Sequence, residues 1–236
     1  MADTGRAPAA SDPKGDDGGE SLSGAVLARL RNALMRGEMV PHQRFKVREL
    51  AQRMGTSETP VREALFQLSR EGAVEIKPRY YIRVRRLSLA EYDEIRDIRM
   101  TLEPMAAERA LPLLTNADID ELAAVHERLV AAEASGDWAT ALQANFDFHF
   151  GLYYRSRRPV IIEVLEGLWI RVGPLLSELY PDAKPTYAVR HQHLNVLDAL
   201  RRREAYTLRD AIRMDLLEGG ARLRQHLAQL ETRPPR

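Results

Sequence analysis

The chain has 236 residues, no cysteine, and 35 Lys and Arg against 34 Asp and Glu, which gives a formal net charge of +1. The absence of cysteine excludes disulfides and thiolate metal sites and is typical of a protein in the reducing cytoplasm. No apolar run approaches the about 18 residues that a membrane-spanning helix needs, so no membrane association is expected.

Charge is distributed unevenly along the chain. Residues 21–86 contain 14 Lys and Arg against 6 Asp and Glu, whereas residues 87–236 contain 19 against 23. A basic segment joined to an acidic one indicates that contact with a polyanion is confined to the first segment. Residues 1–20 are rich in Gly, Asp, Ala and Pro and lack an apolar stretch, so we expect a disordered tail and no secretory signal.

Helices are the first elements expected after this tail. Residues 22–37 carry apolar side chains at helical spacing and end near a glycine. Residues 47–70 predict two short helices joined by a tight turn at Gly55, with Ser57 as the N-cap of the second helix and Pro60 in its first turn. A helix-turn-helix of this kind places the start of its second helix in a DNA major groove.

Two short strands are expected next, at 74–76 and 81–84, joined by the turn 77–80. Three helices followed by a basic hairpin have the element order of a winged helix, in which the hairpin is the wing. Residues 21–86 are therefore predicted to form a winged helix-turn-helix domain that binds DNA, with Arg79 near the duplex backbone.

From residue 87 to residue 231 the pattern is helical throughout. Ser88 and Glu91 have the spacing of a capping box and open this part of the chain. We expect an antiparallel all-α bundle with helices near residues 88–110, 115–134, 137–155, 159–180, 184–202 and 204–230. The predicted fold class is mainly α, with a winged helix-turn-helix followed by this bundle.

Polar side chains interrupt the apolar faces of three of these helices. Asn145 and His149 are four residues apart and share a face. His193 and Asp215 each lie in an apolar stripe of a later helix. Burying such groups without partners costs free energy, so convergence into one site between the helices is the simplest explanation. The other histidines fit no such arrangement and are expected at the surface: His42, His126, His191 and His226.

One long stretch of the basic segment reads PHQRFKVRELAQRMGTSETPVREALFQLSREGAVEIKP. It resembles the DNA-binding domain of the GntR family of bacterial transcription regulators. Four later segments read IRDIRMTLEPMAAERA, NFDFHFGLYY, VIIEVLEGLW and HLNVLDALRRREAYTLRDAI. In this order they resemble the FCD effector domain of the FadR subfamily. Together the two resemblances cover about residues 22–230.

The resemblance implies DNA contacts at Arg48, Ser57, Glu58, Thr59 and Arg62. Relatives often carry Arg where this chain has Glu58, which leaves the operator sequence open. Tyr81 stands where the wing of relatives usually has a glycine at its tip. This difference implies a wing that enters the minor groove less closely.

The resemblance also implies a metal site, because FCD domains often hold an ion through Asp or Asn, a His four residues later and two further His. The matching positions are Asn145, His149, His193 and Asp215, with Asp in place of the third His. This set suits a divalent cation such as Zn²⁺, Mn²⁺ or Ni²⁺ without deciding among them, and hydrogen-bonded core histidines are the alternative. Arg99 matches the effector-binding Arg, which would hold a carboxylate, and the alternative is a salt bridge to Glu103.

These observations predict a homodimeric, ligand-responsive transcription regulator of the cytoplasm that is not an enzyme. It would repress a catabolic or transport operon by binding a palindromic DNA operator, and a small organic acid would control it. Two alternatives stay open: a metal-dependent enzyme built on the helical domain, and an architectural DNA-binding protein without sequence preference. The first would leave the basic segment unexplained, and the second would need no effector cavity.

Overall fold

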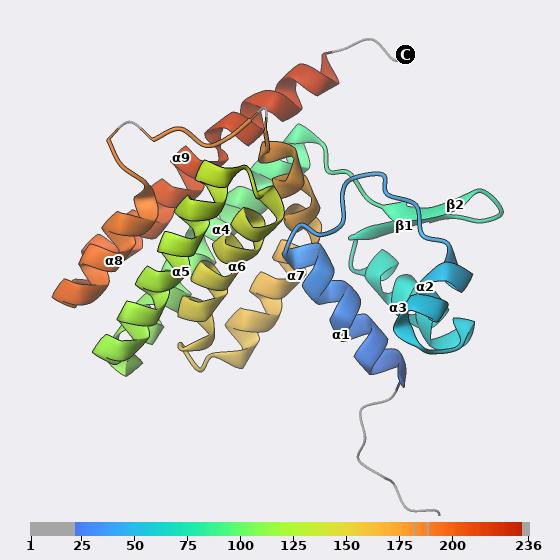
Figure 1. Ribbon diagram of the computed structural model, residues 1–236, viewed down its shortest axis with the longest axis horizontal. Helices are drawn as coiled ribbons and strands as arrows, with labels where there is room; N and C mark the ends of the chain where they lie inside the picture. Colours follow the sequence, from blue (N-terminus) through green and yellow to red (C-terminus); the bar gives the residue numbers. More distant parts are fainter. Residues whose placement is uncertain (1–21, 182, 188, 233–236) are drawn as a thin grey trace, which may run out of the picture.

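The computed structural model describes residues 22–181, 183–187 and 189–232, so the tail predicted for residues 1–20 lies outside the described residues. The described chain forms a small region of helices with one hairpin and a larger region of helices (Figure 1). The predicted fold class, mainly α with a winged helix-turn-helix followed by a helical bundle, is confirmed.

The first region combines helices with a two-stranded antiparallel sheet. Its elements are α1 Leu22–Met35, α2 Val47–Met54, α3 Glu58–Arg70, β1 Val74–Lys77 and β2 Tyr81–Val84. Val74 pairs with Val84 and Lys77 with Tyr81, which fixes the register of the hairpin. Gly55 follows α2 with a φ of 66°, a left-handed conformation that glycine adopts without steric cost, and the chain turns there into α3.

The tip of the hairpin differs from the prediction for Tyr81. The left-handed residue of the turn is Arg79, with a φ of 66°, whereas Tyr81 is the first residue of β2 and pairs with Lys77. The guanidinium of Arg83 stacks over the Tyr81 ring, 4.3 Å from its centroid. Tyr81 therefore closes the strand pair beside the turn, and Arg79 lies within the turn itself.

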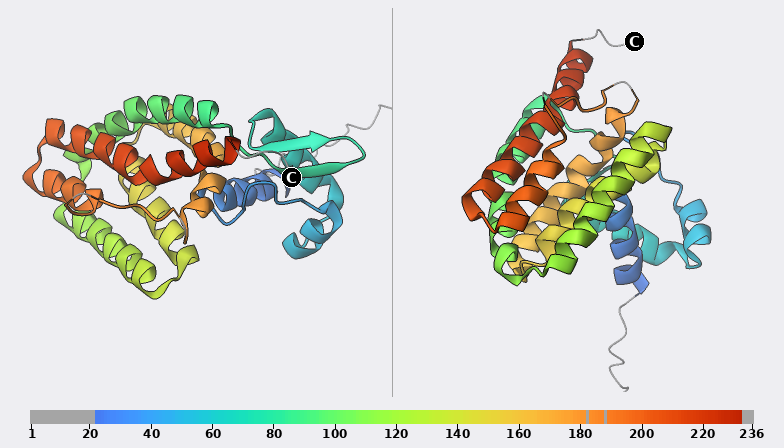
Figure 2. Two further views of the ribbon diagram at one scale, coloured as in Figure 1. Left: turned by 90° about the horizontal axis from the view of Figure 1, so that it is seen from above. Right: turned by 60° about the vertical axis from the view of Figure 1, so that its left-hand side comes forward.

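The second region is a bundle of long helices. Its elements are α4 Leu89–Ala110, the short 3-10 helix η1 Leu111–Leu113, α5 Asn116–Ser135, α6 Trp138–Tyr154, α7 Pro159–Leu176, η2 Ser177–Leu179, α8 Gln192–Arg202 and α9 Ala205–Glu231. Helix α4 packs against α7 and α9, while α5 packs against α6 and α8 (Figure 2). Pro104 lies inside α4 without dividing it. None of the described helices is long and apolar enough to cross a bilayer.

The helix predicted at 184–202 begins later than expected. Helix α8 starts at Gln192, and the described residues from Ala183 to His191 contain no helix. Pro185 disfavours helical backbone at Lys184 only. The start at Gln192 is fixed by His191, whose side chain accepts from the backbone N–H of His193 and caps the helix. Tyr187 and His191 of this segment line the cavity described below, together with residues of α6 and α9.

The two regions meet along α1, which lies between α3 and α7 (Figure 1). Helices α1 and α7 approach closely at Gly173, because a Cβ built there would lie 2.2 Å from the carbonyl oxygen of Leu34 and 2.9 Å from that of Met35. Only a residue without a side chain permits this contact. The winged domain is therefore attached to the bundle by backbone packing on α7.

Candidate functional site

The start of α3 presents an exposed polar surface. Ser57 occupies the N-cap position with extended backbone, as predicted, but its side chain makes no capping hydrogen bond within the described chain. Glu58 and Thr59, the first two residues of α3, are exposed beside it. A hydroxyl and the backbone N–H groups of a helix start are the groups that bind DNA phosphates.

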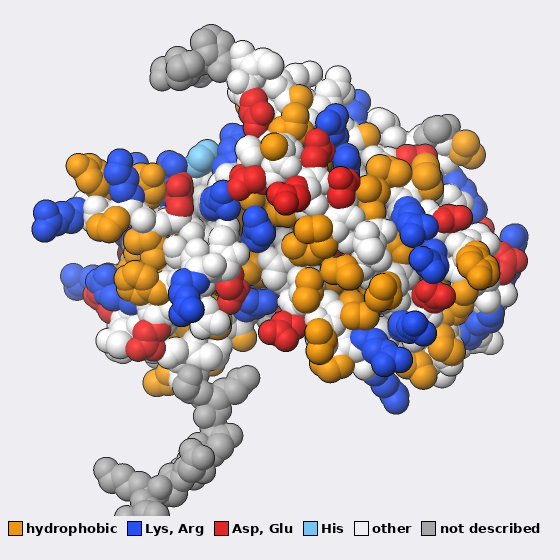
Figure 3. Space-filling view, turned by 180° about the vertical axis from the view of Figure 1, so that it is seen from behind, with side chains coloured by type: hydrophobic (Ala, Val, Ile, Leu, Met, Phe, Trp, Pro, Cys, Tyr) orange, Lys and Arg blue, Asp and Glu red, His pale blue; other side chains and the backbone are white. Residues whose placement is uncertain are grey.

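Arg62 extends this surface by one helical turn. It is exposed, and its Nη2 lies 2.8 Å from Glu58 Oε2. Arg48 is exposed on α2, which packs against α3, and Arg79 is exposed at the hairpin tip. Lys and Arg side chains are visible at this outer end of the molecule, and others lie over the bundle (Figure 3). All predicted DNA-contacting residues are therefore at the surface of the first region.

The predicted metal ligands converge in the interior of the second region. His149 Nε2, from α6, lies 3.3 Å from Asp215 Oδ2 of α9 and 3.4 Å from His193 Nε2 of α8. These three side chains are buried. Asn145 lies one turn before His149 on α6 and lines the same cavity. Residues from three helices thus meet as the apolar stripes of the sequence indicate.

A buried hydrogen-bond network fixes the orientation of His149. Its Nδ1 lies 3.1 Å from the hydroxyl of Tyr153, which donates to Glu103 Oε2 at 2.8 Å. Because the hydroxyl gives its proton to the carboxylate, His149 donates from Nδ1, and this assigns the lone pair to Nε2. That lone pair is directed toward Asp215 and His193.

Glu103 is the centre of this network. Its fully buried carboxylate also accepts hydrogen bonds from Trp169 Nε1 at 2.7 Å and from Arg99 Nε at 2.6 Å. Although burial acts to lower it, the pKa of Arg99 is raised by the charge of Glu103. Burial and the same charge raise the pKa of the Tyr153 hydroxyl. The salt-bridge alternative for Arg99 is therefore present in the structure.

A small cavity adjoins the cluster. The volume of this cavity is about 60 Å³. Arg99, Asn145, His149 and Asp215 line it together with Arg96 and Tyr187. Arg99 thus faces the cavity while its Nε is held by Glu103, and its guanidinium lies 4.4 Å from the Trp169 ring centroid.

The surface position predicted for His126 is wrong, and His191 is only partly exposed. His126 is buried on α5, within the apolar stripe of Leu122 and Leu129, and its ring contacts that of His193. His191 is half-buried and caps α8, where its Nδ1 accepts from the backbone N–H of His193. Burial lowers the pKa of His126, and it lowers that of His191 to about 4. His42 is exposed, and His226 is half-buried.

Sequence reasoning also missed Arg96 and Tyr187. Arg96 lies three residues before Arg99, a helical spacing that puts both cations on one face of α4, and this signal was available. Tyr187 lies in the irregular segment before α8, where no periodic pattern applies. Long-range partners such as Glu103 with Tyr153 and Trp169 have no local signature either.

Comparison with known proteins gives the family. The model of the bacterial regulatory proteins of the gntR family matches residues 22–84, and the FCD domain model matches residues 94–218. The HTH-type transcriptional regulator McbR of Escherichia coli K12 is 36% identical over 171 residues, which are 72% of this chain and 77% of McbR. This chain belongs to the GntR family.

Other GntR-family members extend the likeness. The HTH-type transcriptional repressor RspR of Escherichia coli K12 is 24% identical over 197 residues, which are 83% of this chain and 86% of RspR. The solved structure of E. coli McbR/YncC superimposes with a TM-score of 0.77 at 31% identity, covering 87% of this chain and 98% of that one. The protein is thus a DNA-binding transcription regulator and no enzyme, and the two alternatives are not supported.

Proposed function

We propose that this GntR-family regulator is a homodimeric repressor whose affinity for a palindromic operator changes when a small carboxylate enters the cavity beside Arg99. Residues 21–86 would bind DNA in the cytoplasm, and residues 87–231 would dimerise and bind the effector. The cavity supports this proposal most directly. Arg96 and Arg99 both line it, and Arg96 Nε has no hydrogen-bond partner among the described residues.

The size and charge of the cavity limit the effector. A volume of about 60 Å³ admits a compact molecule. The guanidinium groups of Arg96 and Arg99 would hold its carboxylate, although Glu133 and Asp215 also line the cavity. The acid would be one that a catabolic or transport operon handles. Its binding changes operator affinity only if it favours one arrangement of the two winged domains over another.

The residues Asn145, His149, His193 and Asp215 suit the divalent cation that the FCD family implies. His149 Nε2 and Asp215 Oδ2 are both acceptors and lie 3.3 Å apart, so a cation or a proton is needed between them. The tautomer fixed by Tyr153 leaves His149 Nε2 available as a ligand. When bound, the cation would supply a positive charge beside the cavity that holds an effector carboxylate.

On the DNA, the start of α3 would enter a major groove, with Ser57, Glu58 and Thr59 at the bases or phosphates and Arg62 behind them. Arg48 would contact the backbone from α2, and Arg79 would reach it from the wing. The exposure of this surface supports the proposal. Two-fold symmetry of a dimer would set the half-sites roughly 34 Å apart.

DNase footprinting of the full-length protein on upstream DNA tests the DNA half of this proposal, and we expect one protected palindrome. Operator affinity is then measured with a panel of carboxylates from acetate to citrate. At least one should change affinity by about 5-fold or more, the lower end of ordinary coupling. The Arg96→Gln and Arg99→Gln variants should lose that response, whereas Arg201→Gln, on the exposed surface of α8, should keep it.

Uniform coverage of DNA at all sequences would contradict the operator proposal. A full response to carboxylates in both Arg96→Gln and Arg99→Gln would contradict the assignment of the effector site. Arg99 is buried against Glu103, so its variant requires a check of folding by circular dichroism. Arg96 is half-buried and its variant is expected to fold, which keeps the test decisive.

A further inference from the structure

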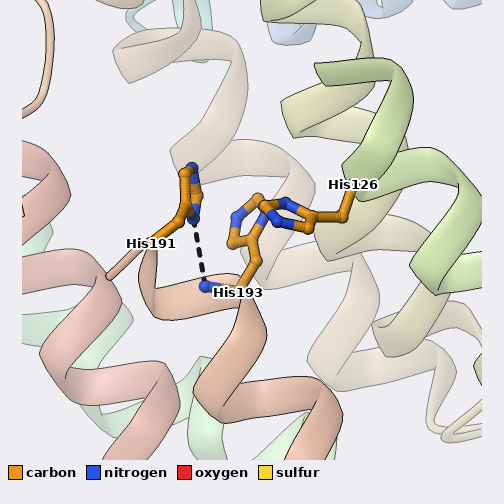
Figure 4. Close-up of side chains that lie close together, drawn as sticks. All are labelled: His126, His191 and His193. Carbon is orange, nitrogen blue, oxygen red and sulfur yellow. Dashed lines mark hydrogen bonds between the residues drawn. The ribbon is translucent and has the colours of Figure 1, made fainter. Parts of the chain in front are cut away.

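A second group of imidazoles shares His193 with the cluster of His149 and Asp215. His126 comes from α5, His191 caps α8, and His193 lies in the first turn of α8. Their rings point toward one another (Figure 4). One ring nitrogen of each lies within 4.8 Å of those of the other two, and the ring centroids are 4.4–5.5 Å apart.

The two histidines that face Asp215 differ in how their second nitrogen is satisfied. His149 has Nδ1 on the Tyr153 hydroxyl, as a metal-binding histidine usually does with an outer partner. His193 has Nε2 toward His149 and Asp215, but its buried Nδ1 has no hydrogen-bond partner among the described residues. A single ion at Asp215 would therefore leave one nitrogen of His193 unsatisfied.

His126 shows the same deficit. Its Nδ1 is also buried and, within the described chain, lacks a hydrogen-bond partner. An unsatisfied buried polar atom destabilises the fold, so the two unsatisfied nitrogens of His126 and His193 call for a shared partner. The stacking of His193 on Phe148, with centroids 3.8 Å apart, explains why the rings are buried but satisfies neither nitrogen.

We propose that His126, His191 and His193 form a cation site made of three imidazoles, adjoining the site of His149 and Asp215 and sharing His193 with it. Three imidazole nitrogens without a carboxylate suit Zn²⁺, Ni²⁺ or Cu²⁺ and disfavour Mg²⁺ and Ca²⁺. Nitrogens bound to one Zn²⁺ lie roughly 3–4 Å apart, since each Zn–N bond is about 2 Å. The present nitrogens, within 4.8 Å of one another, lie close to this range.

His191 provides the route of entry and the adjustable ligand. It lines the cavity and is half-buried, whereas His126 and His193 are buried. Its Nδ1 accepts from the His193 backbone at 3.1 Å, and its Nε2 lies 3.3 Å from the Tyr187 hydroxyl. The cation replaces one of these two contacts. With both sites filled, His193 bridges two ions through Nδ1 and Nε2 and releases its remaining ring proton to solvent.

Calorimetric titration of the metal-free full-length protein with Zn²⁺ tests this site. The double variant His149→Gln, Asp215→Asn removes the neighbouring site and should still bind one Zn²⁺ per chain. Adding His126→Gln should weaken that binding by more than roughly tenfold. Removing only an outer partner of a metal ligand already costs about this much, and His126 would be a ligand itself. His226→Gln is the control, because His226 pairs with Glu178 and belongs to neither site. It should leave Zn²⁺ binding unchanged.

A folded double variant that binds no Zn²⁺, or a triple variant that binds it equally well, would overturn the proposal. Should the variants fail to fold by circular dichroism, ring ¹⁵N shifts of the wild-type histidines decide instead. Saturating Zn²⁺ should shift a ring nitrogen of His126 and of His191, and unchanged shifts would overturn the proposal. Neither measurement involves DNA or a carboxylate, so the result is separate from that of the operator and effector experiments.

Discussion

Arg62 is held by an ion pair at the exposed start of α3. Its Nη2 lies 2.8 Å from Glu58 Oε2, one helical turn away, and both side chains are about half exposed, at 54% and 46%. Exposed pairs of this kind contribute less than about 1 kcal/mol, so DNA can replace the Glu58 contact with little loss. The pair aims the guanidinium without immobilising it.

We expect Arg62→Ala to weaken operator binding by about 10–100-fold, because a base or phosphate contact by Arg is worth about 1–3 kcal/mol. Fluorescence anisotropy with the footprinted operator at fixed salt measures this loss. Arg70→Ala is the matched control, since Arg70 is exposed in the last turn of the same helix. Equal effects of the two substitutions would show that the N-terminal end of α3 is not the part that contacts the DNA.

Glu58→Ala should act in the opposite direction. It removes a negative charge from the DNA-facing surface and releases Arg62, so binding to DNA of unrelated sequence should rise about two- to fivefold. Because Arg62 is then less well oriented, the ratio of operator to unrelated affinity should fall. Competition titrations with both DNAs give the ratio. A lower affinity of the variant for unrelated DNA would contradict this role of Glu58.

At the scale of the element, capping residues decide where helices start. Thr115 is the N-cap of α5: its hydroxyl accepts from the Asp118 backbone N–H, and its own N–H donates to Asp118 Oδ2 at 2.7 Å. Arg155 of α6 reaches Asp118 Oδ1 at 2.9 Å and thereby ties α6 to the start of α5. Hydrogen bonds from the Thr115 hydroxyl and backbone, followed by that from Arg155, lower the pKa of Asp118 to about 2.

This capping box should be visible in the pH dependence of stability. Because the folded pKa of Asp118 lies below its unfolded value of 3.8, its contribution is complete above about pH 4 and is lost as pH falls toward 2. The loss of stability in Asp118→Asn should therefore be constant from pH 7 to pH 5 and shrink below pH 4. Urea unfolding measures it, with Asp120→Asn, an exposed acid of the same helix, as control. A loss that grows on acidification would contradict the capping role.

Local signals account for most of the elements predicted from the sequence. Ser88 and Thr115 begin α4 and α5 at the positions that their capping boxes indicate, and Gly55 makes the turn of the helix-turn-helix. Each of these signals acts within one turn of chain. The late start of α8 was missed because its N-cap is His191, and histidine is not among the residues that usually signal a helix start.

The candidate site was predicted only as far as single faces of helices allow. Asn145 with His149, His193 and Asp215 each lie in an apolar stripe, so their convergence follows from burial. The partners of Glu103 lie 50 and 66 residues away, and helical periodicity carries no information about such pairs. His126 was missed for a different reason, since an imidazole in an apolar stripe also fits a partly exposed helix edge.

At the scale of the whole molecule, α7 connects the cavity with the winged domain. Trp169 lines the cavity and donates to Glu103, and Gly173, one turn later, carries the backbone contact to α1. Arg31 of α1 reinforces this contact through Glu166 of α7 and also pairs with Glu71 after α3. We therefore expect a shift of α7 at the cavity to move α1 and, with it, the DNA-binding surface.

Gly173→Ala tests this connection against a control on the same helix. Its Cβ would lie 2.2 Å from the Leu34 carbonyl oxygen, and backbone atoms cannot yield, so we expect a loss of about 1–3 kcal/mol in the free energy of unfolding. At Gly167 no described atom beyond the adjoining part of α7 itself lies within 4 Å of the added Cβ, so Gly167→Ala should stabilise by up to about 1 kcal/mol. Urea denaturation at pH 7 compares the two variants. Stabilisation by both substitutions would mean that α1 does not rest on α7 in solution, and the winged domain would then move independently of the cavity.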